Sequence, residues 1–353
     1  MSLIQNLPYK DYLAALALPK GKCEVIADLA NLTISFTDNE KPGEVLLKTL
    51  DRRGYSLSQY KNFLVSASQV KTIITYYRPQ TKVAILIAND KYQRLSKLAT
   101  PSMDCDSLAA NLKNLGFIVV TIKNTHSKEL KEILSTVIQE IPEDSYCFVF
   151  LAGHGIELCK MACLLGIECP TEDIQIDHCL TENFIIKEAA KVKPELCVLI
   201  MDACRFNLDR TSNPKIFTSI PDSEDYTTFN NLLIAYSTQS SHAAYEVLEI
   251  ECSTTLDDNV TYELKTGDSA RIVPGSSLYV NALCTRLGDD LDVNSLLDKV
   301  HGDVENSIRK QKPLKVQCGV AKRSLYDPVK GDAAATLAKM KEVTEKFEKC
   351  VVF

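Results

Sequence analysis

The sequence predicts an α/β domain with a mostly parallel sheet and helices on both faces, preceded by a small all-α bundle. After about residue 80, strands that are apolar throughout alternate with amphipathic stretches. Such strands are typical of a parallel sheet that helices cover on both sides. Before that point, apolar residues recur at helical spacing between loops that contain Pro or Gly. The pattern predicts three parts, at residues 1–79, 80–331 and 332–353.

The amino-terminal part is expected to consist of short helices. Their apolar faces are predicted at residues 25–32, 45–50, 60–64 and 70–74. No cluster of titratable side chains in this part indicates chemistry. A small bundle that binds partner proteins is the simplest interpretation.

The second part is expected to supply the sheet and its covering helices. Strands are predicted at residues 83–88, 117–122, 147–151, 197–201 and 231–237. Helices are predicted at residues 107–115, 130–141, 184–192, 278–287 and 293–300. The polar stretch 249–274 lacks periodicity and is expected to be a loop, whereas residues 333–349 are expected to form a helix rich in Ala and Lys.

Charge and composition exclude some classes of function. The net charge of −6 gives no support for binding nucleic acid. The first 80 residues carry ten basic and seven acidic side chains, a net of +3, which leaves −9 for the remainder. An acidic surface favours basic ligands. No run approaches the roughly 18 apolar residues of a membrane span, and no targeting segment stands out, so a cytoplasmic location is expected.

Thirteen cysteines cannot all pair within the chain. Several lie inside apolar runs, so buried thiols in a reducing compartment are expected. The alternative for one segment is a zinc site, although its spacings include no close CxxC pair. The ligands would come from Cys159, Cys163, Cys169, His178 and Cys179.

Two reactive side chains follow two of the predicted strands. The third strand runs into Gly153-His154-Gly155, and the fourth into Asp202-Ala203-Cys204. Parallel sheets bind ligands beyond the carboxyl ends of their strands, so both side chains should project towards one edge. The alternative is that each is structural, a core thiol and a lone histidine.

This pair has the chemistry of a cysteine endopeptidase. An imidazole favours the thiolate form of a neighbouring cysteine, and Cys204 would then attack a peptide carbonyl. The backbone N–H groups of Gly155 and Cys204 would hold the oxyanion, and His154 would protonate the departing amine. This chemistry needs no metal and no cofactor.

The spacing is similar to that of caspases, in which a histidine precedes a Gln-Ala-Cys motif by about 50 residues. Here His154 precedes Cys204 by 50 residues, and the local sequence is Asp-Ala-Cys-Arg-Phe. Asp202 replaces the glutamine. A carboxylate in the pocket wall would repel an aspartate side chain and attract arginine or lysine. The alternative is that Asp202 caps a neighbouring helix.

Several segments resemble the paracaspase family associated with mucosa-associated lymphoid tissue lymphoma, which has a caspase-like fold. The resemblance extends over residues 80–331, and motif order and spacing agree. Its segments are residues 83–89, 98–104, 152–155, 199–205, 231–246 and 323–331. It implies cleavage after arginine, with an acidic specificity pocket at Asp104, Asp202 and Glu246. It also implies a homodimer through the protease domain and a scaffold role in NF-κB-type immune signalling.

The amino-terminal resemblance is shorter. Residues 42–80 resemble the second half of the family's death domain, which implies contacts between the bundle and signalling adaptor proteins. Typical members carry immunoglobulin-like domains before the protease, whereas here residue 80 leads directly into the first predicted strand. Contacts that other members make through those domains are therefore not expected for this chain.

Three further interpretations follow from the sequence. Cys350 to Phe353 fits the C-a-a-X pattern, with lysines just upstream, so Cys350 is a candidate for prenylation and membrane attachment. An adaptor whose caspase-like fold serves assembly is the main alternative to a protease that acts on proteins with basic cleavage sites. A metacaspase is the alternative enzyme, but Arg205-Phe206 follows Cys204 where His-Ser-Gly is expected, and no clustered carboxylates indicate calcium binding.

Overall fold

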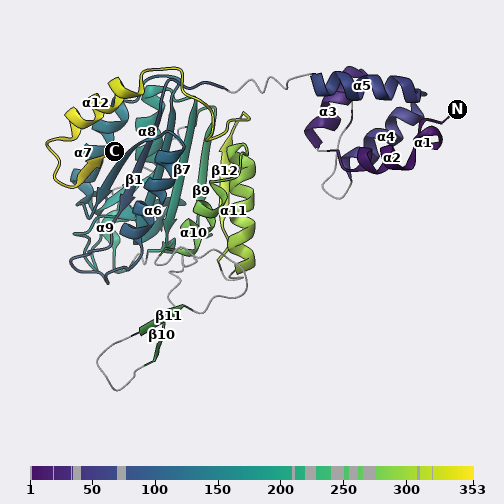
Figure 1. Ribbon diagram of the computed structural model, residues 1–353. Coiled ribbons are helices and arrows are strands. Elements are labelled where there is room, and N and C mark those ends of the chain that lie inside the picture. The colour runs from purple at the N-terminus through teal and green to yellow at the C-terminus, as the bar shows by residue number, and fades with distance from the viewer. Residues whose placement is uncertain are drawn as a thin grey trace. The chain divides into compact units, whose positions relative to one another are not determined.

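A computed structural model describes most of the chain, which forms two compact units, Met1–Tyr76 and Tyr77–Phe353 (Figure 1). The described residues are 2–18, 20–32, 34, 41–69, 77–208, 211–218, 228–239, 250–253, 261–264, 276–307, 311–319 and 321–353.

The first unit is a bundle of short helices, as predicted. Its helices are α1 (Leu3–Asn6), α2 (Tyr9–Leu16), α3 (Lys20–Leu29), α4 (Pro42–Arg52) and α5 (Leu57–Gln69). The amphipathic α4 buries Leu46, Leu47 and Leu50 against Ile26 of α3 and Tyr60 of α5. A fully buried leucine contributes about 2 kcal/mol, so this small core holds the bundle together. The helical face predicted at 70–74 lies outside the described residues, and the death-domain assignment stays a prediction.

The second unit is built on a seven-stranded sheet with the order β12-β9-β7-β3-β1-β2-β13. Its strands are β1 (Lys82–Ala88), β2 (Ile118–Lys123), β3 (Tyr146–Gly153), β7 (Leu196–Ala203), β9 (Leu232–Tyr236), β12 (Leu314–Cys318) and β13 (Cys350–Val352). The five central strands are parallel, and the two edge strands are antiparallel to their neighbours. The predicted parallel sheet is therefore confirmed.

Helices cover both faces of this sheet (Figure 1). One face carries α6 (Pro101–Asn114), α10 (Leu278–Arg286) and α11 (Val293–Ser307), and the other carries α7 (Ser127–Gln139), α8 (Glu182–Val192) and α12 (Ala333–Thr344). In β1, alternate residues enter the two cores, with Leu86 on the α6 side and Ile85 on the α7 side. A strand buried on both faces reads as a continuous apolar run, which explains why these strands could be located from sequence.

The carboxyl-terminal segment corrects one expectation. Residues 332–353 are not helical throughout, because α12 ends at Thr344 and Cys350–Val352 forms β13 at the sheet edge. Phe347 is buried at the turn, and the backbone N–H groups of Phe353 and Val119 each donate to the other residue's carbonyl. Edge strands expose unpaired backbone groups, and β13 covers those of β2.

The stretch expected to be a loop contains an antiparallel pair. β10 (Ile250–Ser253) pairs with β11 (Thr261–Leu264), with Ile250 opposite Leu264. The remaining residues of 249–274 lie outside the described part. Two strands of four residues are too short to give a clear alternating pattern in the sequence.

A second, smaller sheet lies beyond the carboxyl ends of β3 and β7. Its strands were not predicted from the sequence. Its order is β6-β5-β4-β8, from Cys179–Thr181, Met161–Leu165, Gly155–Leu158 and Phe206–Asn207. Cys159 and Lys160 have φ of 50° and 68° and make the two-residue turn between β4 and β5. A short helical turn (Ile176–His178) precedes β6, and α9 (Pro214–Thr218) follows β8.

None of the cysteines whose side chains the structure describes forms a disulfide. Cys163, Cys169 and Cys179 are buried in an apolar cluster beside the small sheet. Within the described part of the chain, no three His, Cys, Asp or Glu side chains are grouped so that they could hold a metal ion, so the zinc alternative gains no support.

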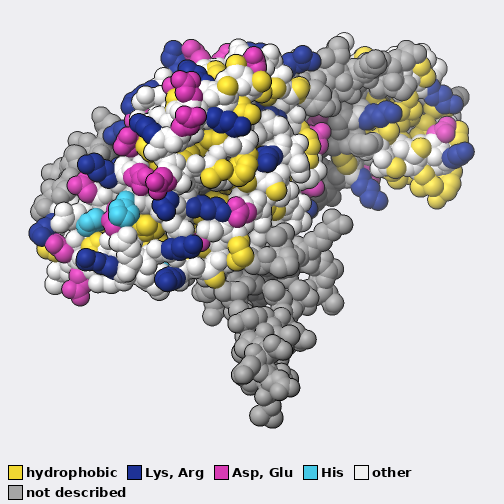
Figure 2. Space-filling view, turned by 60° about the vertical axis from the view of Figure 1, so that its left-hand side comes forward, with side chains coloured by type: hydrophobic (Ala, Val, Ile, Leu, Met, Phe, Trp, Pro, Cys, Tyr) yellow, Lys and Arg dark blue, Asp and Glu magenta, His cyan; other side chains and the backbone are white. Residues whose placement is uncertain are grey.

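The outer surface carries charges of both signs. Figure 2 shows basic and acidic side chains intermingled over one face of the second unit. Among the residues that the structure describes, no helix has the length and apolar character needed to cross a bilayer.

Candidate active site

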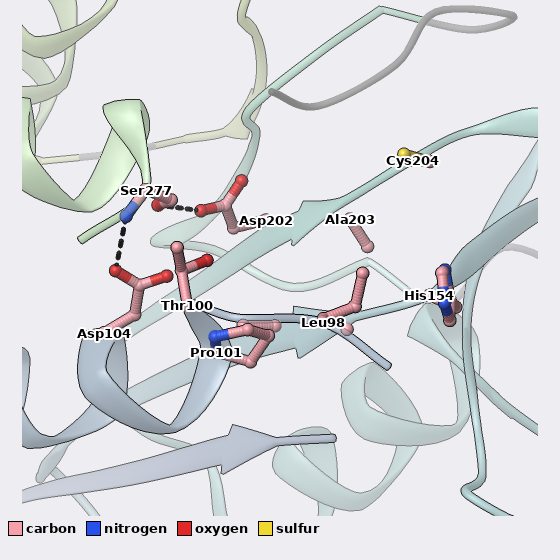
Figure 3. Close-up of a pocket in the computed structure, with 11 residues that line it drawn as sticks. Leu98, Thr100, Pro101, Asp104, His154, Asp202, Ala203, Cys204 and Ser277 are labelled. Carbon is pink, nitrogen blue, oxygen red and sulfur yellow. Dashed lines mark hydrogen bonds between the residues drawn. The ribbon is translucent and has the colours of Figure 1, made fainter. Parts of the chain in front are cut away.

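The strand register brings His154 and Cys204 to matching positions. Gly153 of β3 pairs with Ala203 of β7, and three residues further on Ile156 pairs with Phe206 in the small sheet. His154 and Cys204 therefore lie side by side, between the β3–β7 pairing of the main sheet and the β4–β8 pairing of the small sheet. Both line one cavity of about 90 Å³. Figure 3 shows them at one end of this cavity, beyond Ala203.

The imidazole of His154 is held by a loop that follows β1. Its Nε2 lies 2.8 Å from the carbonyl oxygen of Ser96 and 3.2 Å from the Ser96 hydroxyl. A carbonyl oxygen only accepts, so Nε2 carries the proton and Nδ1 keeps a lone pair. A base oriented by a third group is the arrangement of an activated nucleophile. The Ser96 carbonyl was not identified in the sequence, because a backbone oxygen has no residue signature.

Tyr92, from the same loop, fixes the backbone of His154. Its hydroxyl accepts the His154 N–H at 2.7 Å and donates to the carbonyl of Leu165 at 3.2 Å. Its ring lies 4.6 Å from the imidazole, centre to centre. Tyr92 is 2% exposed, so its position is set by packing. It therefore joins the histidine segment to the small sheet.

Two glycines permit this close packing. A Cβ on Gly153, whose φ is 153°, would lie 2.6 Å from the Tyr92 hydroxyl. A Cβ on Gly155 would lie 2.6 Å from the Cys204 carbonyl oxygen. Both separations are shorter than van der Waals contact. A larger residue at position 155 would push the histidine and cysteine segments apart, and one at position 153 would displace Tyr92. The close approach of Gly155 to the cysteine segment suits its predicted role beside the oxyanion.

The other end of the cavity is acidic. Asp104, in the first turn of α6, and Asp202, in β7, are 1% and 8% exposed, and both line the cavity. Thr100 and Pro101 complete the wall near Asp104, and Leu98 lines the cavity between them and His154 (Figure 3). Burial, and then the neighbouring Asp202 carboxylate, raise the pKa of Asp104 to about 8. The structure thus gathers two of the three predicted pocket residues, and Glu246 lies outside the described residues.

Asp202 does not cap α10, the helix at this end of the cavity. The side chain that accepts the Val280 N–H at the start of α10 belongs to Ser277. Asp202 instead accepts a hydrogen bond from the Ser277 hydroxyl at 2.6 Å. Ser277 was not identified from the sequence, since an isolated serine after a polar stretch carries no distinguishing signal.

A buried ion pair lies directly behind the cysteine. Arg205, adjacent to Cys204, lies 3.0 Å from Glu157 of β4, and both side chains are less than 10% exposed. The guanidinium also stacks 4.1 Å above the ring of Tyr236, whose hydroxyl donates to Glu182 at 2.6 Å. This network ties together the segments that follow His154 and Cys204.

The candidate prenylation residue lies away from this cavity. Cys350 is half-buried in β13, where it pairs with Ile122, and burial raises the pKa of its thiol to about 11. Modification would require the last residues to separate from β2, so the prenylation assignment stays a prediction.

The matches to known proteins include one that lies wholly within the second unit. The profile of the Caspase domain family matches residues 81–324. The chain is 23% identical over 253 residues to the mucosa-associated lymphoid tissue lymphoma translocation protein 1 of Homo sapiens and to its homolog of Mus musculus. It is 28% identical over 130 residues to caspase-12 of Canis lupus familiaris, which covers 36% of this chain and 33% of that one. The first two matches cover 71% of this chain and 27% of each relative, so the chain spans about a quarter of their length.

Proposed function

This chain belongs to the caspase-domain family, as the match over residues 81–324 shows, and we propose that it is a cysteine endopeptidase that cleaves after arginine. One observation carries the proposal. A single cavity has the Cys204 and His154 pair at one end and the Asp104 and Asp202 pair at the other. The first pair performs acyl transfer, and the second selects a basic side chain.

The proposed reaction begins at the cysteine. His154 Nδ1 takes the thiol proton, and the Cys204 sulfur attacks the carbonyl carbon of the substrate peptide bond. Backbone N–H groups at Gly155 and Cys204 hold the oxyanion, an interaction worth about 3 kcal/mol for each donor. His154 then gives its proton to the departing amine, which breaks the C–N bond and leaves an acyl-enzyme. Water, activated by the same imidazole, hydrolyses the thioester and restores the thiol.

The acidic end supplies the specificity. A guanidinium presents several N–H donors in a plane and binds carboxylates with paired hydrogen bonds. An aspartate side chain in the same position would meet the Asp202 carboxylate in a buried site and be repelled. Glu246, assigned by resemblance, would add another acidic side chain.

A cleavage assay tests this proposal. Three fluorogenic peptides that differ only by Arg, Lys or Asp at the cleavage position are compared, with wild type beside Cys204→Ala. We expect rapid cleavage after Arg, slower cleavage after Lys, none after Asp and no activity in the variant. Preferential cleavage after Asp, or full activity in Cys204→Ala, would contradict the proposal.

Assembly forms part of the proposed function. Leu314 and Val316 on the edge strand β12 are 41% and 45% exposed, and an apolar edge suits pairing with a second copy. We place the homodimer interface there. Size measurement of wild type and Val316→Lys tests this placement, because a lysine on the edge should reduce dimerisation.

A second candidate function is that of a signalling adaptor, which is favoured by the separate helical unit. This unit has its own core and leaves Tyr9 and Leu13 77% and 47% exposed. Such side chains suit contact with adaptor proteins of NF-κB-type immune signalling, the context that the resemblance implies. Cysteines that form no disulfide in the described part of the chain suit a reducing, cytoplasmic location. Signalling by cells that carry Cys204→Ala separates the two functions, because an adaptor role would survive the substitution.

A further inference from the structure

One residue contacts both carboxylates of the acidic end. Ser277, 5% exposed, donates its backbone N–H to Asp104 Oδ1 at 2.7 Å. Its hydroxyl donates to Asp202 Oδ2 at 2.6 Å. Figure 3 shows these two bonds running from Ser277 to carboxylates on different elements, α6 and β7. Both donors of this serine are therefore used on the cavity wall.

The same serine is tied to the start of α10. Its hydroxyl oxygen accepts the Val280 N–H at 3.2 Å, so Ser277 is the N-cap of the helix. A hydroxyl has one proton, and here that proton is directed at Asp202 while the lone pair serves the helix. The positive end of the helix also faces the two carboxylates. The position of α10 thus determines how the two carboxylates are held.

The two carboxyl groups share the lining of one cavity, and an anchor that contacts both of them fixes their relative orientation. The described residues that line the cavity include no lysine or arginine. Among the described residues, Asp104 interacts electrostatically with Asp202 of β7, with Cys105 of its own helix and with Cys284 of α10. Tyr279 of α10 faces Asp202. His154 lines the opposite end.

We propose that Ser277 is the positioning residue of the specificity pocket and holds Asp104 and Asp202 in the relative orientation that a guanidinium requires. The inference rests on the proposed cleavage after arginine. Because a guanidinium is planar with donors at fixed angles, its binding depends on how two carboxylates are oriented. A lysine ammonium is a compact charge and depends on that orientation less. Ser277 therefore determines the preference for arginine over lysine.

The test compares kcat and KM for two peptides that differ only by Arg or Lys at the cleavage position. In Ser277→Ala, we expect KM for the Arg peptide to rise about tenfold, the loss expected for a hydrogen bond to a charged group. The kcat should change less than about twofold, since the reacting atoms lie at the other end. KM for the Lys peptide should rise less, and Ser277→Thr should restore arginine preference.

A matched variant separates positioning from simple loss of a helix cap. Asp332 caps α12, on the other face of the sheet, by accepting the Ala335 N–H at 3.0 Å. Asp332→Ala removes a cap without touching the cavity and should leave both KM values unchanged. Equal losses of kcat on both peptides in Ser277→Ala, or an unchanged arginine preference, would overturn the proposal.

A measurement without catalysis keeps the two proposals distinguishable. Carboxyl carbons of ¹³C-labelled aspartate are titrated by NMR in wild type and Ser277→Ala, with Asp104→Asn and Asp202→Asn for assignment. We expect the Asp202 titration to move to higher pH when its hydroxyl donor is lost. Identical titration curves would overturn the role of Ser277. Failure of wild type to cleave either peptide would overturn the proposed function, and the titration would still decide the role of Ser277.

Discussion

The two ends of the cavity are built in different ways. At the end that we propose to be catalytic, called the catalytic end below, His154 and Cys204 follow neighbouring strands directly, and the register of those strands sets them side by side. At the acidic end, Asp104, Asp202 and Ser277 come from α6, β7 and the start of α10. The catalytic pair is thus positioned by backbone pairing, whereas the acidic group is positioned by packing between helices and the sheet.

This difference has a consequence for how each end responds to substitution. Changes at the catalytic end should affect kcat, because they move or remove reacting atoms. Changes at the acidic end should affect KM for basic substrates, because they alter the fit of a charged side chain. Substitutions at each end, compared by their effects on kcat and on KM, test whether the two ends act separately.

The largest effect is expected for the nucleophile. Cys204→Ala should lower kcat roughly a million-fold, the scale seen when a catalytic nucleophile is removed. The free energy of unfolding should change by less than about 1 kcal/mol, since the side chain is small and only half-buried. Peptide hydrolysis and thermal unfolding measure the two quantities. Retained hydrolysis in this variant would show that Cys204 is not the nucleophile.

The next effect concerns the ion pair behind the cysteine. Arg205→Met should destabilise the fold by about 3–5 kcal/mol, because Glu157 is then left buried without its cation. The double variant Arg205→Met with Glu157→Leu should recover much of the loss. Denaturant unfolding provides the measurement, and a single variant as stable as wild type would show that the pair does not hold the two segments together.

At the acidic end, Asp202→Asn should lower kcat/KM for an arginine peptide about a hundredfold, through KM, because a buried charge partner is lost. Alkylation of Cys204 by iodoacetamide should proceed at an unchanged rate, which shows that the catalytic end is intact. Peptide kinetics and mass spectrometry measure these effects. A fall in kcat with constant KM would mean that the two ends are not separable.

A smaller effect is expected for the residue that positions the histidine. Tyr92→Phe removes the hydroxyl that accepts the His154 N–H, so kcat should fall about tenfold with KM unchanged. Tyr326→Phe is the matched control, because it also deletes a hydroxyl bonded to a backbone carbonyl, that of Leu287. Equal activity in the two variants would exclude a positioning role for Tyr92.

The smallest effect is a pH dependence. Asp104 has a pKa of about 8, raised by burial and Asp202, so much of it is protonated at neutral pH. Arginine binds the ionised form, so KM for an arginine peptide should fall several-fold as pH rises from 7 to 9. The stability of the ligand-free protein should instead fall as pH rises through about 8, because ionising a buried acid with a raised pKa lowers the free energy of unfolding. Asp104→Asn should abolish the pH dependence of KM.

Sequence reasoning located the elements with strong local signals. The parallel strands are apolar on both faces, and the reactive residues follow two of them directly. The strands of the small sheet were missed because they are two to five residues long and give no clear period. β13 was missed because three residues after a helix have no strand signature and pair only because the β2 edge is open.

The supporting residues of the site were beyond local reasoning. Tyr92 contacts His154, which is 62 positions away in the chain. Ser277 contacts Asp202, which is 75 positions away. Such distances are bridged only by the folded sheet and its helices. Asp202 was identified because it lies two residues before Cys204, whereas Asp104 came from resemblance alone, since a carboxylate in the first turn of a helix is common.

The most direct test of the whole account is covalent labelling by an arginine-directed probe. A short peptide that ends in an arginine chloromethyl ketone is incubated with the protein, and the modified residue is mapped by mass spectrometry. We predict one adduct, on Cys204 among the thirteen cysteines, formed much faster than with the matching aspartate probe and slowed by Asp202→Asn. Labelling of another cysteine, or faster labelling by the aspartate probe, would contradict the link between the two ends of the cavity.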